Sequence, residues 1–285
     1  MATVGNGIGN VNMVLWTKSV LSKLYRKFFC PSGVVLGDAR EYVAGDDTRL
    51  INWHVTAKTN ALSVNTICAD SGNDIIFALD VSESMKFGTK KQPKISLATD
   101  ILKTLSQLSE TNNDRMGLVA FSHKVEKYFP PRRRAKCFQY AIDKMIHSNE
   151  RLRTDLAAVL GFLNRVLAKR SRVILVCDTF AMAVNRKTIL SQLHILKSRH
   201  DVIMLPLVDD NDMLKARLGR ITVEDSETGE IFEMDTNDIG VMSKIETKYS
   251  TYQKLIFKDV ENVGIKIFPI NTRDSAAEFL FKLFK

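Results

Sequence analysis

From residue 74 onward, short apolar runs alternate with segments of helical periodicity, and this alternation limits the fold more than any other feature of the sequence. The runs 75–79 and 173–177 have the length of a buried strand, whereas the apolar residues between Ile95 and Leu108 recur at the spacing of a helix face. Strands that are apolar throughout and joined by helices are typical of a parallel sheet covered on both faces. The sequence therefore predicts an α/β fold with a mostly parallel central sheet and helices on both faces.

Later segments extend the same pattern. We expect a helix over 138–145, another helix that begins after Thr154 as its N-cap, and a hairpin over 220–235. A long helix is predicted over 241–263, because the glycine that follows it, Gly264, is a natural C-terminal cap.

Residues 1–72 depart from this pattern and predict a small N-terminal extension that contains β-structure. A possible amphipathic helix (14–28) is followed by a turn-rich stretch and one alternating run (61–68). This is too little apolar sequence for an independent core. We therefore predict two parts, an extension over 1–72 and an α/β domain over 73–285.

The two apolar strand runs each end in an aspartate, Asp80 and Asp178. Ser82 and Ser84 follow Asp80 on alternate residues, and Thr154 stands where a loop is expected to enter a helix. Ligands of open α/β sheets bind beyond the carboxyl ends of the parallel strands, so these five side chains are expected to converge. An oxygen-only cluster of this kind suits a hard divalent cation, above all Mg²⁺, with Mn²⁺ or Ca²⁺ in its place.

The same residues resemble the metal-ion-dependent adhesion site of von Willebrand factor A (vWA) domains, which have a Rossmann-like fold. The resemblance rests on Asp-x-Ser-x-Ser, then a threonine 74 residues and an aspartate 98 residues after the first aspartate. It implies that Ser82, Ser84 and Thr154 contact the metal through their hydroxyls, and that the two aspartates bind it directly or through water. An acidic side chain of a partner protein would then complete the coordination. The alternative is structural, since serine and aspartate after strands often cap helices.

A second resemblance lies in the stretch that ends at Trp53, which reads Arg-Glu-Tyr-Val-Ala-Gly-Asp-Asp-Thr-Arg-Leu-Ile-Asn-Trp. It is similar to the defining segment of the bacterial domain of unknown function 58 family, in which the segment precedes a vWA-like domain. Taken as a structural clasp, Gly45 permits a turn, and Asp46 and Asp47 accept hydrogen bonds from backbone N–H groups. Arg49 can pair with one of these aspartates, and Trp53 is expected to bury its ring against the α/β domain. A partner-docking loop is the alternative.

The resemblance to this family implies an adaptor or co-chaperone that works with a MoxR-type AAA+ ATPase or with a target of that ATPase. Together with the metal site, it predicts a metal-dependent protein-interaction module and not an enzyme. A Mg²⁺-dependent hydrolase of phosphoesters is the alternative, although an aspartyl nucleophile would require a second carboxylate where Ser82 stands. The sequence contains neither a P-loop nor a Gly-x-Ser-x-Gly motif.

The formal charge of +9 also raises the possibility of a nucleic-acid-binding protein. The best candidate for such a surface is a basic cluster formed by Arg132, Arg133 and Arg134, which can equally seat an acidic protein. No recognised nucleic-acid-binding module surrounds the cluster, so we expect no nucleic-acid ligand. Residues 1–200 carry 30 basic and 16 acidic side chains, net +14, and residues 201–285 carry 11 and 16, net −5. This asymmetry predicts a polarised surface that steers an acidic partner.

Localisation is predicted from the absence of membrane and disulfide patterns. The sequence has no run of 18 apolar residues, so no spanning helix is expected. The segment 14–28 could lie on an anionic membrane surface, but packing on its own domain is favoured. The four cysteines show no paired or metal-binding spacing and are interpreted as reduced thiols. We therefore expect a cytoplasmic protein, with the inner face of the membrane as a further location.

Overall fold

The structure is a computed structural model, and it describes residues 20–26, 28–29, 39–43, 45–46, 48, 51–65, 73–88, 92–133, 154–182, 185–209, 220–224, 231–235 and 237–285. The chain divides into two compact units. The first consists of 1–72, 111–113 and 280–285, and the second of 73–110 and 114–279. The predicted extension over 1–72 thus shares its unit with two short segments from the remainder of the chain. Among the described residues, no helix has the length and hydropathy that crossing a membrane requires.

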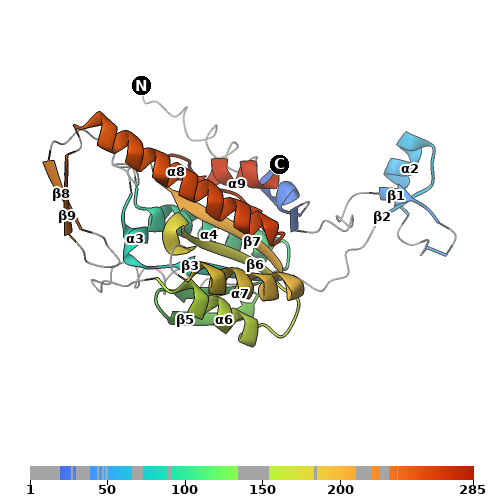
Figure 1. The fold of residues 1–285 in the computed structure, drawn as a ribbon. Helices are drawn as coiled ribbons and strands as arrows, with labels where there is room; N and C mark the ends of the chain where they lie inside the picture. The colour runs from blue at the N-terminus through green and yellow to red at the C-terminus, as the bar shows by residue number, and fades with distance from the viewer. Residues whose placement is uncertain are drawn as a thin grey trace, which may run out of the picture. The chain divides into compact units, whose positions relative to one another are not determined.

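The elements alternate along the chain as expected (Figure 1). In chain order they are β1 (Ala39–Glu41), α2 (Trp53–Thr59), β2 (Ser63–Asn65), β3 (Asp74–Asp80), α3 (Glu83–Lys86), α4 (Lys94–Thr111), β4 (Arg115–Phe121), β5 (Val125–Arg132), α6 (Leu156–Val166), β6 (Arg172–Asp178), the 3-10 helix η2 (Thr179–Met182), α7 (Arg186–Arg199), β7 (Asp201–Val208), β8 (Arg220–Glu224), β9 (Ile231–Asp235), α8 (Ile239–Asn262), β10 (Lys266–Ile267), β11 (Ile270–Asn271) and α9 (Ala276–Phe284). Residues 20–26 and 28–29 are also helical.

A seven-stranded sheet forms the centre of the second unit. Its order is β10-β7-β6-β3-β4-β5, and β11 also pairs with β7. β3 runs parallel to both β4 and β6, and β7 runs parallel to β6, β10 and β11. Among the described strands of this sheet, β5 alone is antiparallel to its neighbour, β4. The predicted fold class, an α/β fold with a mostly parallel sheet between helices, is confirmed.

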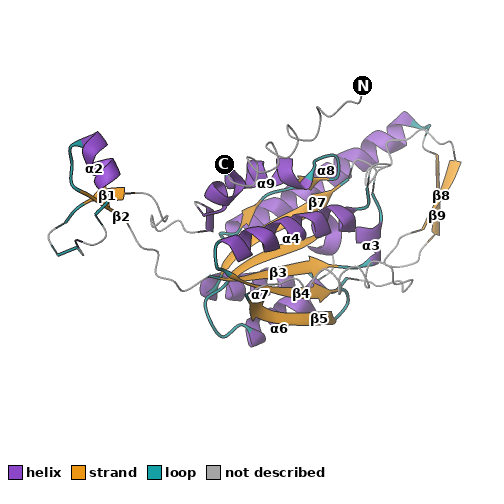
Figure 2. Cartoon of the chain, turned by 180° about the vertical axis from the view of Figure 1, so that it is seen from behind, coloured by secondary structure: helices purple, strands orange, loops and turns teal. Residues whose placement is uncertain are grey.

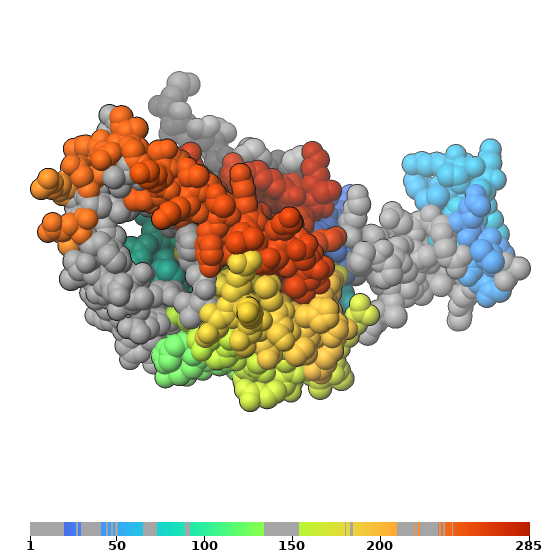
Figure 3. Space-filling view, viewed as in Figure 1, coloured from blue at the N-terminus to red at the C-terminus, as the bar shows by residue number. Residues whose placement is uncertain are grey.

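Side-chain alternation along the strands produces one apolar core on each face of the sheet. Ile76 and Ala78 of β3 and Leu175 and Cys177 of β6 belong to a buried cluster with residues of α6, α7 and α8. These helices cover one face (Figure 1), and the side chains of α7 and α8 adjoin each other over it (Figure 3). The other face is covered by α4 (Figure 2). Successive residues of β3 and β6 therefore point to different helix layers, which decides where the side chains at the strand ends point.

Two later predictions are also confirmed. β8 and β9 form an antiparallel hairpin in which Ile221 lies opposite Met234. α8 ends at Asn262, and Gly264 follows it with φ +83°, a left-handed conformation that favours glycine. The predicted helix over 138–145 lies outside the described residues.

The segment that ends at Trp53 and the residues after it form a small antiparallel pair of strands, β1 and β2, with helix α2 between them in the chain. β1 and β2 are paired with Ala39 opposite Asn65, and α2 connects to them through Asn52, which caps α2 by accepting a hydrogen bond from the N–H of Val55. Gly45 has φ +110°, and the Asp46 carboxylate accepts a hydrogen bond from the N–H of Val43 at 2.9 Å. These contacts are the turn geometry that a clasp requires.

Three of the clasp predictions need comment. Trp53 is 68% exposed, and α2 buries none of its residues. The described residues of the first unit leave the Trp53 ring exposed, and its burial against the α/β domain stays a prediction. Asp47 and Arg49 lie outside the described residues, so their ion pair stays a prediction.

The described helical residues 20–26 and 28–29 bury one face within the first unit. Leu21, Tyr25 and Phe29, spaced four residues apart, are each less than 5% exposed. The ring centroids of Tyr25 and Phe29 each lie 5.9 Å from that of Phe284 in α9. This part of the predicted helix over 14–28 therefore packs on its own chain, as favoured over a membrane surface, while residues 14–19 lie outside the described residues.

Candidate metal centre at the ends of β3 and β6

Two neighbouring parallel strands bring the predicted aspartates to one edge of the sheet. β3 ends in Asp80 and β6 ends in Asp178, and the pairing of Leu79 with Val176 puts both carboxylates at that edge. β4 lies on one side of β3 and β6 on the other, so the order of the strands reverses beside β3. Such a reversal is where open α/β sheets bind ligands.

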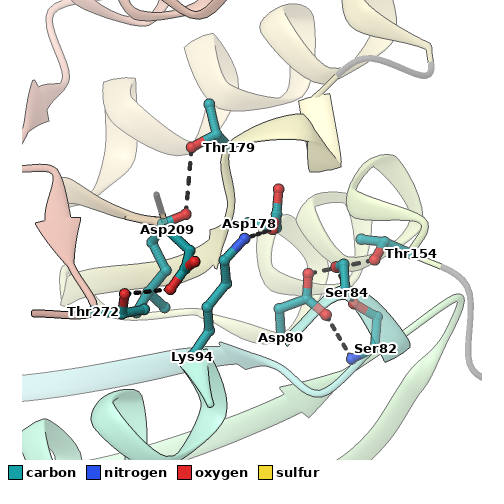
Figure 4. Close-up of polar contacts among 10 residues, drawn as sticks. Asp80, Ser82, Ser84, Lys94, Thr154, Asp178, Thr179, Asp209 and Thr272 are labelled. Atoms are coloured by element: carbon teal, nitrogen blue, oxygen red, sulfur yellow. Dashed lines mark hydrogen bonds and ion pairs between the residues drawn. The ribbon is translucent and has the colours of Figure 1, made fainter. Parts of the chain in front are cut away.

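Asp80 organises the first part of the site. Its side chain is fully buried, and its Oδ1 accepts a hydrogen bond from the N–H of Ser82 at 2.8 Å. Its Oδ2 accepts a hydrogen bond from the Thr154 hydroxyl at 3.4 Å, and the hydroxyl oxygens of Ser82 and Ser84 are 3.1 Å apart. Figure 4 shows the four side chains converging. The structure thus brings together one carboxylate and three hydroxyls from residues up to 74 positions apart.

The local geometry argues against the purely capping role that was the alternative for these residues. Ser82 stands at the N-cap position of α3, but its side chain makes no capping hydrogen bond. The prediction that Thr154 caps the next helix is wrong. Asp155 is the N-cap of α6, and its carboxylate accepts a hydrogen bond from the N–H of Ala158 at 3.0 Å. Because Asp155 performs the capping, the Thr154 hydroxyl is directed to Asp80.

Asp178 has a partner that the sequence analysis missed. Lys94, the first residue of α4, is 1% exposed, and its Nζ lies 2.5 Å from Oδ2 of Asp178 (Figure 4). The sequence contained a sign that Lys94 is buried, because this lysine directly precedes the apolar helix face that begins at Ile95. A cation at the first turn of a helix opposes the helix dipole, so a buried lysine there requires a nearby anion.

A second polar contact at this edge holds the segment ahead of α4. Asp209, which follows β7, is buried and accepts a hydrogen bond from the hydroxyl of Thr272. Gln92 donates from Nε2 to the carbonyl oxygen of Thr272 at 3.5 Å. These bonds connect the start of α4 with the sheet and thereby restrict the position of Lys94.

The thiol between the two aspartates adds no charge to the site. Cys177 precedes Asp178 in β6 and is a free, fully buried cysteine. Burial raises the pKa of its thiol well above the usual range, and the carboxylates of Asp80 and Asp178 raise the pKa further. The thiol is therefore protonated at neutral pH, and the buried charged side chains described at this edge are those of Asp80, Asp178, Asp209 and Lys94.

The basic cluster lies elsewhere. β5 begins at Val125 beside Phe121, at the edge that carries Asp80, and ends at Arg132 opposite Met116. Arg132 therefore lies at the opposite edge of the sheet from Asp80 and Asp178. Arg133 follows it and is exposed, while Arg134 lies outside the described residues. The strand register thus separates Arg132, a predicted partner-binding residue, from the predicted metal ligands Asp80 and Asp178.

The donor set of the site is compatible with a hard divalent cation. Its side chains are two carboxylates and three hydroxyls, and Asp80 and the three hydroxyls lie together. Oxygen donors of this kind are those that Mg²⁺, Mn²⁺ and Ca²⁺ prefer. The Lys94 ammonium is not a metal ligand, and a divalent-cation site does not require a positive charge beside its carboxylates.

Among solved structures, the chain is similar to proteins with vWA domains. A von Willebrand factor type A protein from Catenulispora acidiphila is 12% identical, with 78% of this chain and 42% of that chain covered and a TM-score of 0.44. An aerotolerance-related membrane protein from Bacteroides fragilis is 14% identical, with 75% of this chain and 98% of that chain covered and a TM-score of 0.47. The class of protein that the present fold defines is an α/β domain with an oxygen-lined site at its strand ends.

The family follows from a more extensive match. The family model described as protein of unknown function DUF58 matches residues 38–254, which is more than half of the chain, and the chain belongs to this family. Curated relatives include uncharacterized proteins from Mycobacterium bovis and Mycobacterium tuberculosis. Each is 24% identical over 250 residues, which are 86% of this chain and 77% of the relative. The family resemblance predicted from the segment ending at Trp53 is confirmed.

Proposed function

We propose that the protein is a metal-dependent interaction module of the vWA type, which captures an acidic side chain of a partner protein. Mg²⁺ would be held by five side chains, those of Asp80, Ser82, Ser84, Thr154 and Asp178. The observation that carries this proposal is the convergence of Asp80 with three hydroxyls at the edge where β6 presents Asp178. The bound ion would supply a Lewis-acidic centre that accepts a further carboxylate oxygen.

The residues of the site have two different roles in binding the ion. Asp80 and Asp178 provide two negative charges, while the hydroxyls of Ser82, Ser84 and Thr154 provide oxygens without charge. A divalent ion in this setting is incompletely neutralised once the Lys94 charge is counted, which favours an anionic external ligand. A non-catalytic role is proposed because Ser82 stands where an aspartyl phosphatase would need its second carboxylate.

An exposed apolar side chain borders the site and would add to partner binding. Phe87 follows α3, the helix that contains Ser84, and is 56% exposed. An aromatic residue of this size contributes substantial contact area when a partner covers it. We expect the partner surface to combine a carboxylate with a neighbouring apolar group.

The proposed partner is a MoxR-type AAA+ ATPase, or a target of that ATPase, through which the module would act as an adaptor or co-chaperone. The family resemblance is the support for this identity. The positive charge of residues 1–200, net +14, supports an acidic partner surface in general. We propose that the protein works in the cytoplasm or at the inner face of the membrane.

The test is binding of the immobilised protein to a MoxR-type ATPase of the same organism, in constant Mg²⁺. Asp80→Asn and Thr154→Val are expected to lose binding, while Asp74→Asn, at the other end of β3, retains it. Because Mg²⁺ is present throughout, the ATPase keeps its own metal, and any loss belongs to the module. Phe87→Ser should weaken ATPase binding without changing Mg²⁺ affinity. Binding that is equal in the wild type, Asp80→Asn and Thr154→Val would contradict the proposal.

A further inference from the structure

The Lys94–Asp178 ion pair is an unusual feature for a site that is meant to receive a second cation. Both side chains are almost completely buried, with 2% and 7% of the side-chain surface exposed. Removing two charges from water carries a large desolvation cost, which a single short contact offsets only in a favourable geometry. A lysine that is present merely to pack against its neighbours would not need this position.

The backbone in front of α4 directs Lys94 to Asp178. The carbonyl oxygen of Phe87 accepts a hydrogen bond from the N–H of Lys94 at 3.0 Å, which closes the loop between them. At Gly88, an added Cβ would lie 2.5 Å from the carbonyl oxygen of Gln92 and 2.9 Å from the Cα of Pro93. Only glycine permits this close approach of backbone to backbone. The close backbone contact at Gly88 and the hydrogen bond between Phe87 and Lys94 therefore fix the start of α4, from which Lys94 reaches Asp178.

Side-chain alternation explains how Lys94 reaches the site from the other face of the sheet. Cys177 belongs to the core beneath α6, α7 and α8, so its neighbour Asp178 points to the layer of α4. Asp80 has the same alternation as Ile76 and Ala78, and it receives Thr154 from the loop before α6. The Thr154 hydroxyl thus reaches the site from the layer of α6, and the Lys94 ammonium reaches it from the layer of α4.

The charges of the site can be counted with and without this lysine. Asp80 and Asp178, the two predicted carboxylate ligands, together carry −2, and Lys94 reduces the sum of these three groups to −1, while Asp209 at the same edge adds its charge equally with and without the lysine. A divalent ion raises the total to +1 with Lys94 present, but only to 0 without it. A positive charge near the metal position weakens cation binding and, once the metal is bound, strengthens the attraction for a carboxylate.

We propose that Lys94 is a built-in cation that lowers the affinity of this site for the divalent ion and raises the affinity of the loaded site for an acidic ligand. It competes with the divalent ion for Asp178, so that metal affinity is moderate, and it makes the loaded site one charge more positive, which favours an acidic ligand. This inference rests on the proposed function, since it assumes that Asp80, Asp178 and the hydroxyls bind a divalent ion. It assigns to Lys94 a positioning and tuning role that the five predicted ligands do not supply.

The test compares Lys94→Met with the wild type in two titrations. The first measures Mg²⁺ binding by calorimetry, and the second measures binding of acetate, as the carboxylate probe, to the Mn²⁺-loaded protein by nuclear relaxation. We expect Lys94→Met to bind Mg²⁺ about tenfold more tightly, a size typical of changes around metal ligands. We expect its affinity for acetate to fall by about the same factor. The opposite signs of the two changes are what a merely structural lysine would not produce.

Lys103→Met is the matched control. Lys103 lies on the same helix, is partly exposed and pairs with Asp100 at 3.7 Å, so it loses the same charge away from the site. It should leave both affinities unchanged. Equal changes in Lys103→Met and Lys94→Met would show that the effect is one of overall charge and would overturn the inference.

Lys94→Met leaves Asp178 buried without its ammonium and is expected to be less stable without metal. Thermal unfolding with and without Mg²⁺ keeps the test decisive, because the metal should raise the midpoint of Lys94→Met by more than that of the wild type. An equal rise in both proteins, or equal Mg²⁺ affinities, overturns the role of Lys94 while the proposed function stands. No Mg²⁺ binding by either protein overturns both.

Discussion

At the residue scale, the site depends on a division of labour between adjacent side chains. Thr154 and Asp155 are both residue types that cap helices, yet the structure gives the cap to Asp155 and turns the Thr154 hydroxyl to Asp80. The same distinction applies to Ser82, which occupies a cap position without making the capping bond. Neighbouring residues of similar chemistry thus have separable roles.

This separation predicts opposite phenotypes for two neighbouring substitutions. Asp155→Ala removes the cap of α6 and should lower the free energy of unfolding by about 1 kcal/mol, with Mg²⁺ binding retained. Thr154→Val keeps the shape of the side chain, so stability without metal should change little while Mg²⁺ affinity falls. Chemical denaturation and Mg²⁺ titration of both variants measure the two effects. Loss of stability in Thr154→Val with normal metal binding would mean that its hydroxyl is structural.

The sequence predicted the edge of the sheet at which Asp80 and Asp178 lie, because that edge follows from the strand pattern. Buried runs that end in Asp80 and Asp178 must present these carboxylates at the same edge if the strands are parallel. Lys94 could not be placed in the same way, because its ion pair joins residues 84 positions apart and depends on β3 lying beside β6.

At the element scale, the junction of α7 and β7 contains a buried titratable group. His200 is 3% exposed, and its Nδ1 accepts a hydrogen bond from the N–H of Ser171 at 3.3 Å. Burial lowers the pKa of His200, and the guanidinium groups of Arg199 and Arg170 lower the pKa further. The folded protein therefore holds this ring neutral.

The lowered pKa predicts a loss of stability in mild acid. The unfolded chain takes up a proton on His200 near pH 6.5, whereas the folded chain resists doing so. The contribution of the neutral ring is thus present above about pH 6.5 and is lost as the pH falls below that value. We expect the free energy of unfolding to decrease from about pH 6.5 to pH 5, and His200→Asn to flatten this decrease. Parallel stability curves for both proteins would assign the pH dependence to other groups.

The elements that position the site were predictable to different degrees. The alternation of β3, α4, β4 and β6 gave the layers, because buried strands and amphipathic helices have distinct periods. The order and direction of the strands do not follow from periodicity. The sequence therefore did not predict that Arg132 and Asp80 lie at opposite edges of the sheet. The end of β5 at Arg132 lies opposite Met116, so only the register shows that Arg132 lies at the other edge of the sheet.

At the scale of the whole molecule, the aromatic cluster ties the described N-terminal helix to the end of the chain. Phe284 is 2% exposed and contacts the rings of Tyr25, Phe28 and Phe29. Because these residues lie at opposite ends of the sequence, the cluster closes the first unit over long range.

Truncation of that cluster is expected to cost about 3 kcal/mol of unfolding free energy, as for other buried phenylalanines. Phe284→Ala should therefore lower the thermal midpoint and expose the N-terminal helix to limited proteolysis. Phe87→Ala, a phenylalanine that is already exposed, is the control and should unfold as the wild type does. Equal stability of Phe284→Ala and wild type would contradict the packing of this helix on its own chain.

The central claim for the molecule is that its strand-end site holds a divalent ion, and direct titration of Mg²⁺ into the metal-free protein tests it most directly. We predict saturable binding of Mg²⁺ by the wild type and by Asp74→Asn, which changes the opposite end of β3. Asp80→Asn keeps the size of the side chain but removes the buried charge that accepts hydrogen bonds from the Thr154 hydroxyl and the Ser82 N–H, and it should abolish this binding. Absence of binding to the wild type in millimolar Mg²⁺, or undiminished binding to Asp80→Asn, would contradict the claim.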